Sequence, residues 1–142
     1  MLTLAPGPER QLVELAHVTD PQTWMLVGGL MVHIHAHMAR VPHSRPTNDV
    51  DVVLLPGRGY YPVTAAALAS VGYAPQESLD SSAPFHRFVR GSDIVDVMVG
   101  EGRGVRFLGR RVVEVPGSRS ATNHATWVEL EQKVSINLPD LA

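Results

Sequence analysis

The chain contains no cysteine among its 142 residues, which excludes a disulfide framework, a thiolate zinc site and a cysteine nucleophile together. Charge is also sparse and nearly balanced, with 18% charged residues and a formal net charge of -2. A chain of this balance has no general attraction to nucleic acid or to an anionic membrane. Any such partner must therefore be met by a local patch.

Long hydrophobic runs are also lacking. The longest apolar stretch, residues 24–39, is interrupted by three histidines and a glycine pair, so it is too short and too polar to span a bilayer. Residues 1–10 show no positive region followed by an apolar stretch, and we expect no secretion signal. These observations predict a cytoplasmic protein with no membrane partner. The length and the 44% hydrophobic content suit one domain over residues 1–142.

Hydrophobic periodicity and chain-breaking residues predict the secondary structure. Helices are expected over residues 9–18, 30–40 and 61–71. Strands are expected over residues 24–27, 50–55, 85–90, 94–99 and 111–115, with residues 91–93 as a hairpin turn and a further hairpin over 127–130 and 134–138. Helices and strands in this order predict an α/β (α+β) domain in which helices flank a mixed β-sheet.

Three aspartates are the clearest chemical signal. Asp49 and Asp51 are two residues apart at the head of a strand, so their side chains leave the same face. Asp96 lies inside a second apolar strand, where an unpaired carboxylate costs roughly several kcal/mol. Three converging carboxylates would also repel one another. A divalent cation removes both problems, and oxygen ligands without cysteine favour Mg²⁺ or Mn²⁺ over zinc.

A structural explanation remains open for these residues. An aspartate at the end of a strand can be capped by a backbone amide or by an arginine, and for Asp49 this explanation has as much weight as metal binding. It is weaker for Asp51 and Asp96, because both lie inside apolar strands. Asp93 lies in the predicted turn and is expected to be structural.

A glycine pair, Gly28-Gly29, joins a predicted strand to a predicted helix. Glycine lets the backbone approach a ligand closely, and the first turn of a helix offers free N–H groups to an anion. A tight turn needs glycine for steric reasons alone, so the pair does not by itself identify a ligand site. Its meaning comes from the cation of Arg45 and the hydroxyl of Thr47, which precede the Asp49-x-Asp51 strand.

This combination resembles the nucleotidyltransferase superfamily, and is closest to the bacterial AbiEii-type toxin nucleotidyltransferases, which show GG followed by R-x-T-x-D-h-D, where h is hydrophobic. The matching segments are residues 27–29 (VGG), His35 and residues 45–52 (RPTNDVDV). Residues 86–88 (HRF) followed by 94–97 (IVDV) resemble the hairpin that carries the third carboxylate of the family. The resemblance covers residues 26–99.

The resemblance implies roles for these residues. Gly28 and Gly29 would hold the triphosphate of an NTP, in a nucleotide site that also contains Arg45 and Thr47. Asp49 and Asp51 would bind two Mg²⁺ (or Mn²⁺) ions. Asp96 would complete the second metal site and help to deprotonate an acceptor hydroxyl. Arg45 would neutralise phosphate charge or orient Asp49.

The resemblance also implies partners. The leading acceptor is tRNA or another RNA, for a toxin that has a cognate antitoxin. A small-molecule acceptor such as an antibiotic is a variant of the same chemistry. A binding module without turnover and a metal-dependent phosphoesterase would use the same residues, and the glycine turn ahead of the aspartates disfavours the phosphoesterase.

Three further signals carry less weight. His33 and His37 share a helix face while His35 does not, so these histidines cannot converge on one metal; for His35 and for His86, a place lining the pocket and a packed, hydrogen-bonded role are both open. The serines of the loops lack a nucleophile elbow, which disfavours a serine hydrolase. The basic residues of 103–111 form a solvated surface or a contact for RNA phosphates: Arg103, Arg106, Arg110 and Arg111.

The C-terminal residues also raise an expectation. Asn137 as a cap and Pro139 in a first turn predict the start of a helix. Members of the resembled family continue into a helical region at this point, so we expect the chain to lack that region.

Overall fold

The computed structural model describes residues 7–41, 47–117, 125–130 and 135–139. Its helices are α1 (Pro8–Val18), the short 3-10 helix η1 (Pro21–Thr23), α2 (Gly28–Met38) and α3 (Tyr61–Ser70). The strands of the main sheet are β1 (Trp24–Val27), β2 (Asp49–Leu54), β3 (Ala74–Gln76), β4 (Arg87–Arg90), β5 (Asp93–Gly100) and β8 (Glu114–Val115). Two strand pairs complete the fold: β6 (Arg106–Phe107) with β7 (Arg110–Arg111), and β9 (Ala125–Glu129) with β10 (Ser135–Pro139).

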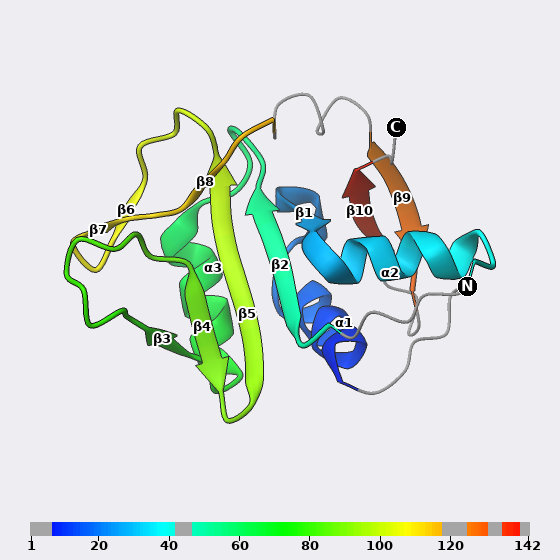
Figure 1. Ribbon diagram of the computed structural model, residues 1–142, viewed down its shortest axis with the longest axis horizontal. Helices are drawn as coiled ribbons and strands as arrows, with labels where there is room; N and C mark the ends of the chain where they lie inside the picture. The colour runs from blue at the N-terminus through cyan, green and yellow to red at the C-terminus, as the bar shows by residue number, and fades with distance from the viewer. Residues whose placement is uncertain (1–6, 42–46, 118–124, 131–134, 140–142) are drawn as a thin grey trace.

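The main sheet has the strand order β1-β2-β5-β4-β3, and β8 pairs with the end of β5. Strands β2 and β5 run parallel at its centre, while β1 and β4 flank them in the antiparallel sense. Figure 1 shows α3 behind β4 and β5. The predicted mixed sheet flanked by helices is therefore confirmed.

One face of the two central strands belongs to the hydrophobic core. Alternate residues of β2 and β5 pack into it, among them Val52 and Val97, neither of which has any exposed surface. Leu12 of α1 and Leu68 of α3 are buried in the same cluster. Successive side chains of a strand point to opposite faces. Asp51, next to Val52, and Asp96, next to Val97, therefore lie on the other face of the sheet.

Helix α3 is hydrogen-bonded to the centre of the sheet. Tyr61, at the start of α3, is buried, and its hydroxyl donates a hydrogen bond of 2.9 Å to the carbonyl oxygen of Val97. Pro62 lies in the first turn of α3, where a backbone N–H has no partner within the helix. The N–H that proline lacks therefore costs no hydrogen bond at this position. The start of α3 thus holds β5 from the core face of the sheet.

Several element boundaries differ from the sequence-based expectation. Helix α2 begins at Gly28, so the glycine pair forms its first turn and not a separate connection. Strand β4 begins at Arg87, and Phe85 forms an isolated bridge with Val112. The strand predicted over 111–115 is divided between β7 and β8.

Residues 135–139 form strand β10, so the helix start predicted at Asn137 and Pro139 is wrong, whereas the predicted pairing of two strands in this part of the chain is confirmed. Asn137 pairs with Trp127 in the antiparallel ladder between β10 and β9. Ile136 and Leu138 have no exposed surface, and this burial outweighs the local capping signals. None of the helices within the described residues has the length and apolar character of a membrane span.

Candidate metal and nucleotide site

Three carboxylates meet on the face of the sheet opposite the core. The parallel register of β2 and β5 places Asp51 directly beside Asp96, and Asp49 beside Ile94. One oxygen atom from each of Asp49, Asp51 and Asp96 lies within 4.8 Å of the other two. Asp96 is only 5% exposed, and the other two aspartates are half-buried. The two strands therefore bring together the three residues that the sequence singled out.

The glycine pair lies directly against this cluster. Strand β1 pairs Val27 with Asp51, so the next residue, Gly28, reaches the carboxylates. Gly28 has a φ of 74°, in the left-handed region, and a Cβ atom there would collide with the carboxylate of Asp51. A Cβ atom at Gly29 would lie 3.2 Å from Oγ1 of Thr47. Gly28 thus requires glycine, whereas at Gly29 a larger residue would press on the Thr47 side chain.

The first turn of α2 has no side-chain cap among the residues that the structure describes. Its N-cap residue, Val27, makes no side-chain hydrogen bond to the helix. The first N–H groups of a helix have no partner within the helix, and the helix dipole adds a partial positive charge. A phosphate group is the kind of ligand that such a helix start accepts. Its position beside the carboxylates places a candidate anion site next to a candidate cation site.

Arg87 is the counter-ion of the cluster. In the antiparallel pairing of β4 and β5 it stands opposite Asp96. Its Nε donates to Oδ1 of Asp96 at 3.0 Å and its Nη2 to Oδ2 at 3.2 Å, so the contact is two-pronged. Nη2 also lies 3.6 Å from Oδ2 of Asp49. An arginine cap was one of the two explanations considered for Asp49, and Arg87 provides it in part. The main partner of Arg87, however, is Asp96.

One arginine does not balance three carboxylates. The pKa of Asp51 is raised from 3.8 to about 7, first by burial and then by the neighbouring Asp96 and Asp49, while Arg87 acts in the opposite direction. A carboxylate that is hard to ionise in the free protein gains most from a bound cation. The three residues could hold a divalent metal ion, and among the described residues they are the group of side chains that fits one. Their all-oxygen donor set is that of a hard cation.

The predicted nucleotide-binding residues are only partly placed. Thr47 lies beside Gly29, and its hydroxyl is 3.5 Å from the carbonyl oxygen of Asp49. Arg45 lies outside the described residues. The structure therefore brings Gly28, Gly29 and Thr47 to the cluster.

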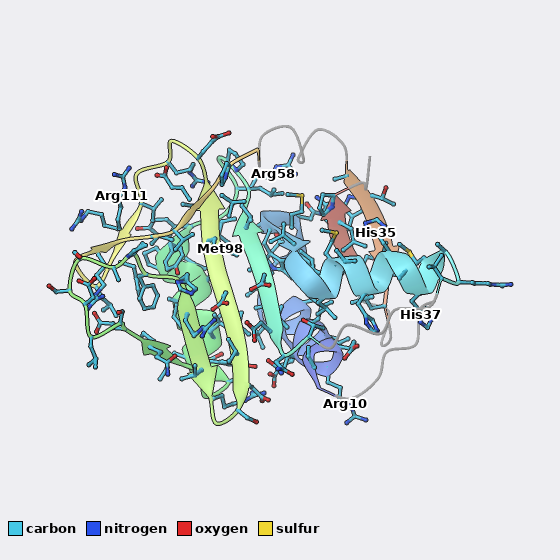
Figure 2. The ribbon with its side chains drawn as sticks, in the orientation of Figure 1. Arg10, His35, His37, Arg58, Met98 and Arg111 are labelled. Atoms are coloured by element: carbon cyan, nitrogen blue, oxygen red, sulfur yellow. The ribbon has the colours of Figure 1, made fainter. Side chains whose placement is uncertain are left out.

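The histidines have separate partners. Nε2 of His35 lies 2.8 Å from the carbonyl oxygen of Pro139, and Figure 2 shows His35 and His37 on α2. His35 is thus packed and hydrogen-bonded and makes no contact with the carboxylates. Nε2 of His33 lies 3.5 Å from Glu9. By contrast, Nε2 of His86 lies 3.9 Å from Oδ1 of Asp96, at the border of the site.

The arginine cluster mostly serves the fold. Arg110 binds the carbonyl oxygens of Asp80, Ala83 and Ser78 and pairs with Glu77. Arg103 donates to the carbonyl oxygen of Gly59. Arg111, whose side chain is 66% exposed, lies at the β6–β7 end of the molecule, away from α2 (Figure 2).

Sequence reasoning assigned no role to Arg87, and the cause is a one-residue error in the hairpin register. A three-residue turn over 91–93 would place Asp96 opposite Phe88. The turn has two residues, Gly91 and Ser92, so Arg90 pairs with Asp93 and Arg87 with Asp96. Gly91 has a φ of 59°, and glycine at the first position of a two-residue hairpin turn is the signal that would have found this register.

No protein-family model matches the sequence, and the comparison with curated proteins found no match. Among solved structures, the chain is similar to a crystal structure of ANT(2")-Ia in complex with adenylyl-2"-tobramycin. The identity is 17%, the TM-score is 0.47, and the match covers 75% of this chain and 68% of that one. A similarity of this degree does not define a function, which has to come from the site itself.

Proposed function

We propose that this chain is a metal-dependent nucleotidyltransferase that moves an NMP group from an NTP to a hydroxyl acceptor. The observation that supports the proposal is the meeting of Asp49, Asp51 and Asp96 beside the glycine pair in the first turn of α2. Nucleotidyl transfer needs both halves of this arrangement, because the triphosphate and the cations that neutralise it must lie side by side.

The proposed roles are those that the family resemblance implies, and the positions of the described residues support them. The first-turn N–H groups at Gly28 and Gly29 hold the triphosphate, with Thr47 at its side and Arg45, from outside the described residues, as a further phosphate ligand. Asp49, Asp51 and Asp96 are the ligands of Mg²⁺ or Mn²⁺, which when bound supplies positive charge to the attacking and leaving oxygens. Asp96 is buried and the other two carboxylates are half-buried, so charges at this site act more strongly than in water.

The reaction balances without a further reactant. The acceptor oxygen forms a bond to the α-phosphorus, the bond from that phosphorus to the bridging oxygen breaks, and pyrophosphate leaves. A carboxylate oxygen of Asp96 takes the proton of the acceptor hydroxyl. This residue is the most buried of the three, so its side chain is held in a defined place.

The proposed acceptor is an RNA, with tRNA first, in a toxin that is paired with a cognate antitoxin. Arg106 and Arg111 are exposed and could contact RNA phosphates, although Arg111 also pairs with Glu114 at 3.5 Å. A small hydroxylated antibiotic is the second candidate, since it needs the same chemistry and a smaller acceptor surface.

The test is transfer of a labelled α-phosphate. The purified chain is incubated with each α-labelled NTP and Mg²⁺, together with total RNA in one arm and a panel of aminoglycosides in the other. We expect label on an acceptor and release of pyrophosphate in wild type, and neither in Asp49→Ala. Release of inorganic phosphate without an acceptor would indicate the phosphoesterase instead, and NTP binding without product would indicate a binding module.

A further inference from the structure

Arg87 contacts the three carboxylates unequally. It holds both oxygens of Asp96 through two hydrogen bonds and reaches Asp49 at 3.6 Å. Its effect on Asp51 is a longer-range lowering of the pKa. The guanidinium is therefore bound most closely on the Asp96 side of the cluster, and its contact with Asp49 is longer than either hydrogen bond to Asp96.

We infer that Arg87 is an internal counter-ion that controls the order of cation loading: the first divalent cation binds at Asp49 and Asp51, and a second reaches Asp96 only after Arg87 has released it. This inference rests on the proposed function, because it concerns the same carboxylates. It makes Arg87 a positioning residue, which acts through Asp96 and not on the reacting atoms.

Charge supports this order. With Arg87 in place, three ionised carboxylates retain two uncompensated negative charges, and one divalent cation neutralises them. A second cation beside Arg87 would leave the cluster strongly positive. A bound triphosphate removes that excess and also gives the released guanidinium a new anionic partner, because arginine binds phosphate as readily as carboxylate.

The setting of Arg87 permits release. Its side chain is 34% exposed, whereas that of Asp96 is 7% exposed. The arginine can thus turn toward solvent or toward a phosphate group, while the carboxylate stays in the sheet. A long side chain at the rim of a site loses little burial when it moves in this way.

The test measures Mn²⁺ binding to the full chain by calorimetry at pH 8.5, with and without a non-hydrolysable NTP analogue. Without nucleotide we expect wild type to bind one Mn²⁺, and Arg87→Ala to bind the first on the order of tenfold more tightly, because a nearby positive charge is gone, and to take up a second. Arg87→Lys keeps the charge but loses the two-pronged contact, so it should lie between them. Arg58→Gln, an exposed arginine in the loop after β2 (Figure 2), is the matched control and should equal wild type.

The results separate this inference from the proposed function. A merely structural arginine would give weaker or unchanged binding on removal, so either result in a folded Arg87→Ala overturns the inference while the wild-type metal site stands. Two Mn²⁺ ions bound to wild type without nucleotide would also overturn it. Equal Mn²⁺ binding by wild type and Asp51→Asn would instead remove the metal site, and with it the proposed function.

Discussion

The β4–β5 hairpin carries two arginine–aspartate pairs, and in each pair the arginine lies on β4 and the aspartate opposite it on β5. Near the turn, Arg90 is opposite Asp93, with 2.9 Å between Nη2 and Oδ2. Three residues further along, Arg87 is opposite Asp96. The two pairs have the same chemistry, but three residues separate them along each strand, so they lie on opposite faces of the sheet: the Arg90 pair on the face that carries the core, and the Arg87 pair on the face of the carboxylate cluster.

The surroundings give each pair a different character. Arg90 also binds Glu14 at 2.9 Å and the carbonyl oxygen of Val71 at 2.9 Å, and its guanidinium lies 4.5 Å from the ring centre of Tyr73. It ties α1, α3 and the hairpin together, and Asp93, which begins β5 and does not lie in the turn, takes part in this structural network. The Arg87 pair lies beside a second strand that adds two more carboxylates and a glycine turn. An ion pair becomes a candidate site where its neighbours leave charge uncompensated.

The largest expected effect comes from removing one carboxylate of each region. Asp51→Asn should lower nucleotidyl transfer by more than about 100-fold, since even residues that only orient metal ligands are worth 10–100-fold. Asp93→Asn should leave the transfer rate within about twofold and lower only the stability, by roughly 1 kcal/mol. Rates with a labelled NTP and unfolding by urea measure both. If the two variants lost equal activity, the distinction between the two pairs would be wrong.

Divalent cations should separate the regions by stability. At 100 times its Kd a bound ion stabilises the folded state by about 2.7 kcal/mol, which corresponds to roughly 8 °C in Tm for a domain of this size. We expect Mg²⁺ or Mn²⁺ to raise the Tm of wild type and of Asp93→Asn, and EDTA to reverse the rise. Thermal unfolding of Asp51→Asn should show little response. An unchanged wild-type Tm at saturating Mn²⁺ would count against a metal site.

Two glycines with positive φ allow a matched test of the glycine turn. Gly28→Ala brings a Cβ atom into the carboxylate of Asp51, whereas Gly91→Ala at the hairpin turn meets nothing within 4 Å. Both variants should lose about 1–2 kcal/mol for a left-handed alanine. Only Gly28→Ala should also lose cation binding and transfer activity. Calorimetry and urea unfolding on both proteins check this, and equal cation affinity in the two would show that the turn only serves the fold.

Much of the fold could be predicted from sequence because its signals are local. The apolar β2 and β5, the helices and the glycine turn each follow from a short pattern of residues. Asp49 and Asp51 could be assigned to one face because side chains alternate along a strand. The meeting of Asp51 with Asp96 depends on a parallel pairing between distant segments. No local pattern predicts this pairing, and it was suggested by the shared chemistry of the three aspartates and by the family resemblance.

The missed features depend on register and tertiary burial. Arg87 was missed because the predicted three-residue turn places Phe88 opposite Asp96, whereas the two-residue turn of the structure places Arg87 there. The helix start expected at Asn137 was wrong because pairing with β9 buries Ile136 and Leu138 completely. In both cases the local residues were compatible with two outcomes, and contacts with another strand decided between them.

The smallest expected effect is a pH dependence of stability in the metal-free protein. Because the pKa of Asp51 is raised from 3.8 to about 7 on folding, the folded state binds more protons than the unfolded chain between about pH 4 and pH 7. Stability should therefore fall as the pH rises through this window, in contrast to a carboxylate whose pKa folding lowers. Asp51→Asn should be less sensitive to pH across the window. Urea unfolding in EDTA at half-unit pH steps gives the difference in unfolding free energy between wild type and Asp51→Asn. The contribution of the histidines cancels in this difference because both proteins contain them. If wild type became the less stable protein toward low pH, a raised pKa of Asp51 would be contradicted.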